Sequence, residues 1–208
     1  MPGINNLNKY IAVAGNIGSG KSELIEFLCN SYRLVRLDRA HENNPYIDNF
    51  YNDMQSWSFH SQIFILTKKF QHFQNLSPSG QSVIQSRTIH EDAEIFARNL
   101  FKSGQMSEID FRTYYDFYKC LTSATPAPDL LIYLHSSVSS LRKRLRANHD
   151  PHELLISDTY LRHINRLYVN WIADYDLSEV VIIDTEQLDV ASNFVDRVDI
   201  LESIERFI

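Results

Sequence analysis

The chain has 208 residues, 44% of them hydrophobic and 22% charged, which indicates a globular protein with a sizeable core and excludes a disordered chain. Its formal net charge of −6 argues against broad nucleic-acid binding, and no apolar run approaches the length of a membrane span. The N-terminal stretch, MPGINNLNK, lacks the apolar core of a signal peptide, so we expect a cytoplasmic protein. Because no internal repeat or low-complexity linker divides the sequence, we expect residues 1–208 to form a single domain.

Short apolar runs alternate with helical patterns along the sequence, and five of these runs predict strands. One of them, DLLIYL, is nearly continuous, as expected for a strand buried on both faces of a sheet. The expected strands cover residues 11–14, 34–38, 82–86, 129–134 and 180–184. The expected helices cover about residues 22–29, 46–54, 56–75, 91–102, 107–122, 141–147, 158–175 and 193–208. This alternation predicts an α/β fold with a doubly wound, five-stranded parallel sheet flanked by helices.

The most informative stretch follows the first strand and has the pattern G-x-x-x-x-G-K-[ST], the Walker A phosphate loop. Glycine lets the backbone wrap closely around a phosphate, and the next helix presents its positive N-terminal end to the same anion. In this pattern Lys21 reaches the β and γ phosphates, and the hydroxyl of Ser22 binds Mg²⁺. We therefore expect the phosphates of a nucleotide to be bound by Gly15, Asn16, Ile17, Gly18, Ser19, Gly20, Lys21 and Ser22.

The predicted topology brings other segments to the same place. Ligands of doubly wound sheets bind outside the carboxyl ends of the strands. The phosphate loop, the polar loop at residues 38–44 and the Ser-Arg-Thr at residues 86–88 each follow a predicted strand. We therefore expect these three segments to surround one crevice.

The chain resembles the deoxynucleoside kinases, in particular the bacterial, purine-preferring kind. The resemblance rests on GNIGSGKS, NPYIDNFYNDMQSWSFHSQIF, SRTIHEDAEIFARNL, PDLLIYLHSS and the ELLIS stretch near residue 153. It implies a five-stranded phosphate-loop fold, a helical bundle at a dimer interface and an arginine-rich lid over the phosphates. It also implies ATP and Mg²⁺ as cofactors, and transfer of the γ-phosphate to the 5′-hydroxyl of a deoxynucleoside.

The resemblance assigns roles to individual residues outside the phosphate loop. Gln62 matches a glutamine that reads the edge of the base, and Tyr51 and Glu153 match the pair that holds the sugar 3′-hydroxyl. Arg87 matches an arginine near the 5′-hydroxyl and the phosphates, and Arg144 matches the first arginine of the lid. The other positions implied to form the nucleoside site are Trp57, Lys69, Asp92 and Phe96, of which Lys69 stands in place of a base-reading arginine.

Three departures from the family's pattern bear on phosphoryl transfer. Arg39 stands where the family has the glutamate that acts as general base for the 5′-hydroxyl. Ser86 replaces an acid near Mg²⁺, and the Asn-His-Asp at residues 148–150 replaces the Arg-Gly-Arg of the lid. A neighbouring acid can act as a displaced base, and strand periodicity favours Glu42 over Asp38. Because a general base and phosphate-binding arginines each contribute orders of magnitude in rate, we expect impaired turnover.

Two functions fit these observations. The first is an ATP-dependent deoxynucleoside kinase for purines, in which Lys21, Arg87 and Glu42 act in catalysis and Arg39 occupies the usual position of the base. The second is a weak or inactive nucleotide-binding paralogue that regulates an active partner subunit. In either case we expect a homodimer, or a heterodimer with an active paralogue, and neither nucleic acid nor membrane as a partner.

Overall fold

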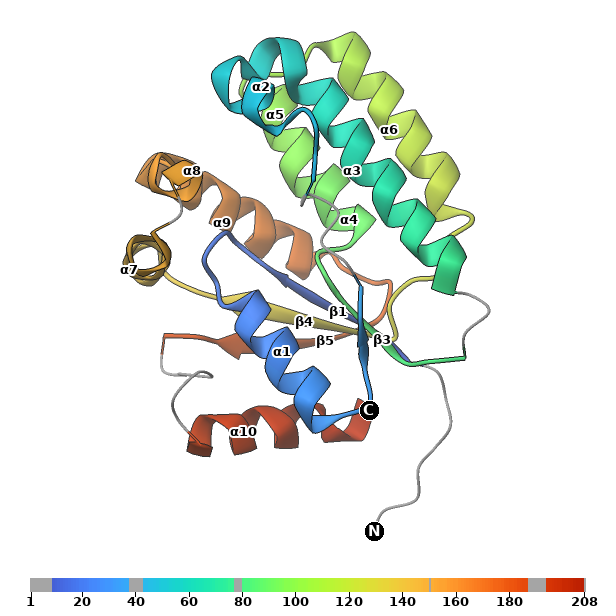
Figure 1. Cartoon of the computed structure of the whole chain (residues 1–208), viewed down its shortest axis with the longest axis vertical. Coiled ribbons are helices and arrows are strands. Elements are labelled where there is room, and N and C mark those ends of the chain that lie inside the picture. Colours follow the sequence, from blue (N-terminus) through green and yellow to red (C-terminus); the bar gives the residue numbers. More distant parts are fainter. Residues whose placement is uncertain (1–8, 38–42, 77–79, 150, 187–193, 208) are drawn as a thin grey trace.

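The computed structural model describes residues 9–37, 43–76, 80–149, 151–186 and 194–207 of the chain. Five parallel strands form one sheet in the order β2-β3-β1-β4-β5, which confirms the predicted doubly wound sheet (Figure 1). The strands are β1 (Tyr10–Gly15), β2 (Val35–Arg36), β3 (Val83–Ser86), β4 (Leu130–His135) and β5 (Glu179–Asp184). Since the chain extends the sheet from β1 in both directions, the strand order reverses beside β1, where folds of this class bind ligands.

Helices cover both faces of the sheet, so the central strand β1 is buried on both sides (Figure 1). Ile11 and Val13 pack toward α1 (Lys21–Ser31) and α10 (Phe194–Ile204). Ala12 and Ala14 face the opposite way, toward α9 (Asp158–Ala173). This alternation explains why β1 and β4 are almost continuously apolar in sequence.

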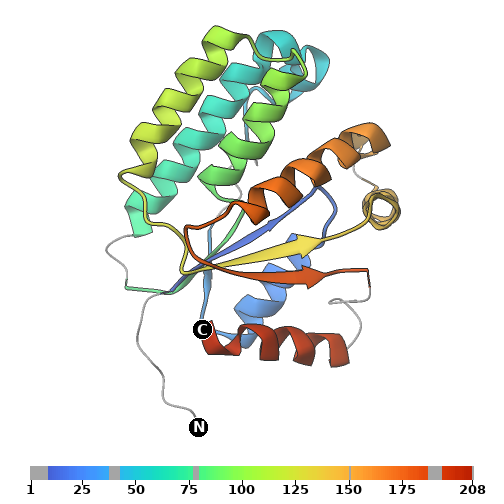
Figure 2. The same cartoon turned by 180° about the vertical axis from the view of Figure 1, so that it is seen from behind.

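A helical bundle stands beside the α9 face of the sheet, as the view from behind shows (Figure 2). Its own core contains Leu66, Ala93, Tyr114 and Tyr118. Its helices are α3 (Met54–Leu76), α4 (Ile89–Glu91), η1 (Asp92–Ala97), α5 (Arg98–Lys102) and α6 (Glu108–Thr122). The bundle therefore extends one side of the sheet with a second hydrophobic core.

The helix predicted at residues 91–102 differs from the observed one in two ways. It begins at Ile89, because Thr88 and Glu91 form a capping box. It also contains the π-helical segment η1, in which the N–H of Arg98 bonds to the carbonyl of Ala93, five residues earlier. Within this segment the predicted helix therefore departs from the regular α-helical hydrogen-bond pattern.

The remaining helices are short or lie near the carboxyl edge of the sheet. They are α2 (Ile47–Asn52), α7 (Val138–Asn148), α8 (Pro151–Leu154) and η2 (Glu205–Phe207). The helix predicted at residues 141–147 is longer in the structure, because α7 extends from Val138 to Asn148, and the short helix α8 was not predicted. In the described part of the chain no helix is both long and apolar enough to cross a membrane.

Candidate active site

The phosphate loop joins β1 to α1 and follows a path that requires glycine. Gly15 has φ 147° and Gly18 has φ 77°, which side-chain-bearing residues rarely adopt. A Cβ atom at Gly15 would lie 2.6 Å from Ser19 Oγ and 2.9 Å from the carbonyl oxygen of Leu134. One at Gly18 would lie 2.9 Å from a methyl group of Leu145. The loop thus packs tightly against β4 and α7 while α1 begins directly behind it.

Lys21 lies inside this loop, with only 8% of the residue exposed. Its Nζ donates to the carbonyl oxygens of Gly15, at 2.8 Å, and Asn16, at 2.6 Å. Burial lowers the pKa of Lys21 well below its ordinary value, and the positive charge of Arg87 lowers it further. A bound anion would relieve both effects, so these two cations fit a phosphate-binding role.

The phosphate loop is also fastened to α9. The side-chain amide of Asn16 donates to the carbonyl of Leu161 at 3.0 Å and to Oδ1 of Asn165 at 2.6 Å. Asn165 in turn donates to the carbonyl of Ser136, just after β4, at 2.8 Å. Asn16 is therefore a structural residue of the loop, and its partner Asn165 carried no signal in the sequence.

The turn after β3 brings Arg87 to the same region. Arg87 has φ 60°, a left-handed backbone, and its N–H bonds to the carbonyl of Val13 at 3.0 Å. Its guanidinium carbon lies 4.4 Å from the centroid of the Phe96 ring. Its Nε is buried and has no hydrogen-bond partner among the described residues. Arg87 therefore connects the phosphate side of the site with an aromatic residue of the predicted nucleoside side.

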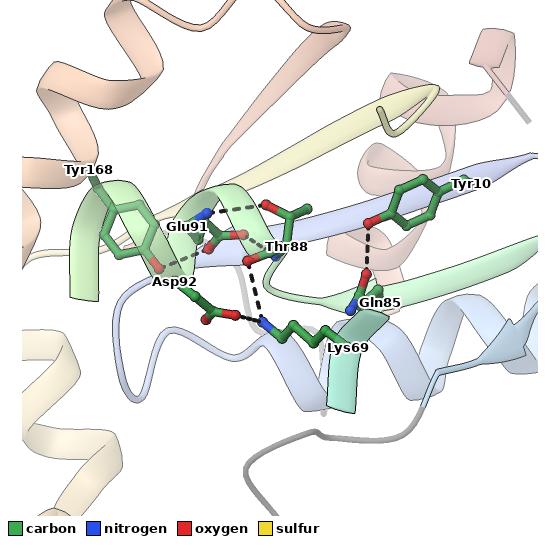
Figure 3. A network of polar contacts seen from close by, with 7 residues as sticks. All are labelled: Tyr10, Lys69, Gln85, Thr88, Glu91, Asp92 and Tyr168. Atoms are coloured by element: carbon green, nitrogen blue, oxygen red, sulfur yellow. Dashed lines mark hydrogen bonds and ion pairs between the residues drawn. The ribbon is translucent and has the colours of Figure 1, made fainter. Parts of the chain in front are cut away.

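A buried ion pair lies under this turn (Figure 3). Lys69 Nζ is 2.5 Å from a carboxylate oxygen of Asp92 and donates to the carbonyl of Thr88 at 3.3 Å. Lys69 and Asp92 are only 4% and 5% exposed. Gln62 lies on the same helix, α3, seven residues before Lys69, and is 7% exposed. These three residues, predicted to read the base, are thus all buried side chains.

A cavity of about 290 Å³ opens at the carboxyl edge of the sheet and unites much of the predicted site. Lys21 and Ser22 line it together with Tyr51, Arg87 and Glu153. These five residues come from four different segments of the chain. The full lining is Ile17, Gly18, Ser19, Gly20, Lys21, Ser22, Glu23, Tyr51, Ser86, Arg87, Arg144, Ala147, Asn148, Glu153 and Ile156. The structure therefore brings the phosphate loop next to the residues that the resemblance assigned to the sugar and the 5′-hydroxyl.

Other predicted residues lie away from the cavity wall. Its lining does not include Gln62, Lys69, Asp92, Phe96 or Trp57. Trp57 is half-buried and stacks on Tyr46, with 5.8 Å between ring centroids. Arg39 and Glu42, predicted near the 5′-hydroxyl, lie outside the described residues, as does Asp38.

Arg144 lines the cavity, but its guanidinium is also anchored. It donates to Ser136 Oγ at 3.2 Å, to Thr185 Oγ1 at 3.1 Å and to the carbonyl of Thr185 at 2.7 Å. Among the described residues three of its five N–H groups are bonded in this way, which leaves two that could meet a ligand. Arg144 therefore joins α7 to the ends of β4 and β5, and it faces the cavity from this fixed position.

Two buried residues in the site were not found from the sequence. Glu91 is fully buried, and its carboxylate accepts from the N–H of Thr88 and from the hydroxyl of Tyr168, each at 2.9 Å (Figure 3). The capping pattern T-x-x-E was a readable signal for Glu91. Tyr168 carried none, because it looks like an ordinary core residue of α9. Within the described residues no group of three or more His, Cys, Asp or Glu side chains forms a metal site.

Comparison with known proteins agrees with this architecture. The family model described as deoxynucleoside kinase matches residues 11–208, so the chain belongs to the deoxynucleoside kinase family. The chain is 32% identical over 199 residues to the deoxyadenosine/deoxycytidine kinase of Bacillus subtilis (strain 168), with 92% of each protein covered. It is 28% identical over 177 residues to the deoxyguanosine kinase of the same organism, covering 83% of this chain and 79% of that protein.

A solved structure supports the same assignment. The structure of deoxyadenosine kinase from M. mycoides with bound dATP superimposes with a TM-score of 0.81 at 26% sequence identity. The superposition covers 94% of this chain and 99% of that one. The fold is therefore that of a phosphate-loop nucleoside kinase, and the relatives of this chain are deoxynucleoside kinases.

Proposed function

We propose that this chain is an ATP- and Mg²⁺-dependent kinase that transfers the γ-phosphate to the 5′-hydroxyl of a purine deoxynucleoside. One observation carries the proposal: the phosphate loop and three residues matched to the nucleoside end, Tyr51, Arg87 and Glu153, line the same cavity. A nucleotide bound in the loop and a nucleoside held at the other end of that cavity would meet beside Arg87.

The cationic side chains support binding of ATP. Lys21 and Arg87 lower the cost of placing the phosphates in the cavity, and Arg144 adds a third cation from α7. The glycine-lined loop offers backbone N–H groups to the same phosphates. Ser22 would supply a hydroxyl to Mg²⁺, and the metal when bound neutralises charge that develops during transfer.

The buried polar residues support a base-reading role. Gln62 offers a donor and an acceptor side by side, and Lys69 and Asp92 form a charged pair. Phe96 lies against the guanidinium of Arg87. Trp57 would complete the wall, and Tyr51 with Glu153 would hold the 3′-hydroxyl. The preference for purines is supported by the relative named deoxyguanosine kinase. The relative named deoxyadenosine/deoxycytidine kinase carries one purine and one pyrimidine nucleoside in its name.

We further propose that turnover is slow. Ser86 and Asn148 line the cavity and are uncharged, at positions where the family carries an acid and an arginine. Arg39 cannot accept a proton, because a guanidinium stays protonated at any working pH. Glu42 is the candidate replacement for the base, and its efficiency would depend on how closely it approaches the 5′-hydroxyl.

The same uncharged lining favours a second candidate, a nucleotide-binding paralogue that regulates an active partner. Both candidates share a single domain, a location in the cytoplasm, a dimeric state and the absence of nucleic-acid or membrane partners. Exposed apolar residues on helices support the dimer, for example Val169 on α9 and Phe117 on α6. Sedimentation velocity of the protein alone, and after mixing with an active relative, separates the homodimer from the heterodimer.

A coupled assay of ADP release decides between the candidates. Each of the four deoxynucleosides is added in turn to the protein with ATP and Mg²⁺, while ATP binding is measured by calorimetry. ADP release with deoxyadenosine or deoxyguanosine supports the kinase. ATP binding without ADP release from any deoxynucleoside supports the regulatory paralogue, and absence of ATP binding contradicts both.

A further inference from the structure

Glu91 is a fully buried carboxylate beside the turn that carries Arg87, and it has no part in the proposed transfer. One oxygen accepts the N–H of Thr88 at 2.9 Å, and the other accepts the hydroxyl of Tyr168 at 2.9 Å. The N–H of Glu91 bonds back to the hydroxyl of Thr88 at 3.3 Å. Such a side chain is costly to bury unless its charge and its hydrogen bonds are compensated, so its position calls for a physical reason.

The turn beside Glu91 needs support from its surroundings. The left-handed backbone of Arg87 is unfavourable for a side-chain-bearing residue and persists only when neighbouring contacts hold it. The N–H of Arg87 is bound by Val13, and the next residue, Thr88, is held at its N–H, its hydroxyl and its carbonyl. Glu91 makes two of these three contacts with Thr88, and Lys69 makes the third (Figure 3).

Glu91 also compensates the charge of Arg87. Burial acts to lower the pKa of Arg87, but Tyr168, Glu91 and Asp92 outweigh it and hold that pKa above its ordinary value. Burial raises the pKa of Glu91 itself, against the opposing effects of the Thr88 N–H and the cations Lys69 and Arg87. The two buried charges therefore stabilise each other, while the guanidinium stays against Phe96 and at the cavity wall.

We propose that Glu91 is a positioning residue that holds Arg87 toward the phosphate loop, and that Tyr168 locks Glu91 in place. The functional consequence rests on the proposed function, because it takes Arg87 to meet the phosphates of ATP. The structural consequence does not, since it concerns only the orientation of Arg87 in the free protein.

The same helix that holds Glu91, α9, also contacts the phosphate loop. Tyr168 and Asn165 are three residues apart and so lie on neighbouring positions of one helix face. Tyr168 binds Glu91, and Asn165 binds Asn16 of the phosphate loop. Helix α9 thus sets the position of Arg87 relative to the phosphate loop, and under the proposed function both contact the phosphates of ATP.

The first test observes Arg87 in the free protein by NMR. The Nε–Hε signal of Arg87 is assigned by its loss in Arg87→Lys, and burial of Nε should protect its proton from exchange. We expect Glu91→Gln to shift or broaden this signal, because the amide has no negative charge and offers one oxygen acceptor where the carboxylate offers two. Tyr168→Phe should shift it less, because this variant keeps the aromatic ring and leaves the carboxylate of Glu91 unchanged. An unchanged signal in either variant overturns the corresponding part of the proposal.

Glu94 provides a matched control. It lies on the same helical segment, accepts the hydroxyl of Tyr115 at 2.5 Å and pairs with Arg98 at 2.5 Å, so its chemistry resembles that of Glu91. It does not line the cavity. We expect Glu94→Gln to leave the Arg87 signal unchanged, and an effect as large as that of Glu91→Gln would overturn the proposal.

The second test measures binding of ATP with Mg²⁺ by calorimetry. Glu91→Gln should weaken binding on the order of tenfold, the scale of one charge-assisted hydrogen bond. In the Arg87→Ala background the same change should cause no further weakening, because Glu91 acts through Arg87. Equal weakening in both backgrounds would indicate a merely structural role and would overturn the proposal. If the unmodified protein does not bind ATP, the proposed function fails, while the NMR test still decides the role of Glu91.

Discussion

Lys21 is electrostatically unfavourable in the free protein, which fits its proposed role in binding the phosphates of ATP. Its ammonium is buried, the positive charge of Arg87 lowers its pKa further, and among the described residues its hydrogen-bond partners are neutral oxygens of the loop. A phosphate would supply the missing negative charge. The free protein therefore carries an electrostatic cost that ligand binding removes.

We expect Lys21→Met to abolish most of the stabilisation that ATP and Mg²⁺ confer on the unmodified protein. A ligand at 100 times its dissociation constant stabilises the folded state by about 2.7 kcal/mol, which appears as a higher Tm. The measurement is thermal unfolding with and without the nucleotide. Lys102→Ala, which removes an exposed lysine of α5, should keep the full shift. A full shift in Lys21→Met would mean that ATP binds elsewhere.

The same variant makes a prediction about pH. Because the folded-state pKa of Lys21 is lowered, the unfolded chain binds more protons than the folded one between that pKa and the ordinary value near 10.4. Stability of the unmodified protein should therefore rise with pH across this window. Lys21→Met lacks this term, so its stability relative to the unmodified protein should fall between pH 7 and pH 10, by about 1.4 kcal/mol per unit of lowered pKa. Urea unfolding at both pH values tests this, and a constant difference would contradict it.

The residues proposed to read the base make a third prediction. Gln62 presents an amide, and Lys69 and Asp92 present both a cation and an anion, which together suit the amino-bearing bases. We expect deoxyadenosine, deoxyguanosine or deoxycytidine to bind more tightly than thymidine in calorimetric titrations. Tightest binding of thymidine would contradict the assignment of these residues to the base.

At the scale of elements, α9 contacts both the phosphate loop, through Asn165, and the helix after the Arg87 turn, through Tyr168. We expect Asn165→Ala to lower the free energy of unfolding by about 1 kcal/mol, because Ser136 loses a donor and Asn16 loses an acceptor. ATP binding should weaken at the same time. Asn170→Ala, an exposed asparagine on the same helix, is the control and should change neither quantity. Urea unfolding and calorimetry give the two measurements, and an unaltered affinity in Asn165→Ala would mean that α9 does not position the loop.

The elements also show which features of this fold a sequence can predict. Strands β1, β3 and β4 were predictable because both of their faces are buried, which leaves continuous apolar runs such as LLIYL in β4. The edge strand β5 was predicted from its apolar run, although Ile182 within it is 61% exposed. The π-helical η1 was not, because its one-residue shift depends on packing between α3, α6 and α9 rather than on any local pattern. In the site, the phosphate loop was readable from residues 15–22 alone. The pairing of Glu91 with Tyr168 joins residues far apart in the chain, so no spacing could reveal it.

At the scale of the whole molecule, the cavity concentrates positive charge in a chain of net charge −6. Lys21, Arg87 and Arg144 come from the ends of β1 and β3 and from α7, so the site exists only when the sheet is assembled. Acidic side chains near transferring phosphates normally hold the metal and accept the substrate proton. The resemblance to the family assigns Ser86 and Arg39 to these positions, so under the proposed function catalysis would depend on another acid of the molecule replacing them.

We expect turnover far below the 1 s⁻¹ or more that is typical of kinases. Ser86 is neutral, so Mg²⁺ loses a charged ligand, and Arg39 cannot take the 5′-hydroxyl proton. The double variant Arg39→Glu with Ser86→Asp should raise turnover at least tenfold, a change of about 1.4 kcal/mol in the barrier. Full activity should not return, because residues 148–150 still lack arginine. Steady-state kinetics with saturating ATP and deoxyadenosine measure the change. An ordinary kinase rate in the unmodified protein would mean that Glu42 already serves as the base, and a double variant that binds both substrates without a gain would place the defect in the lid.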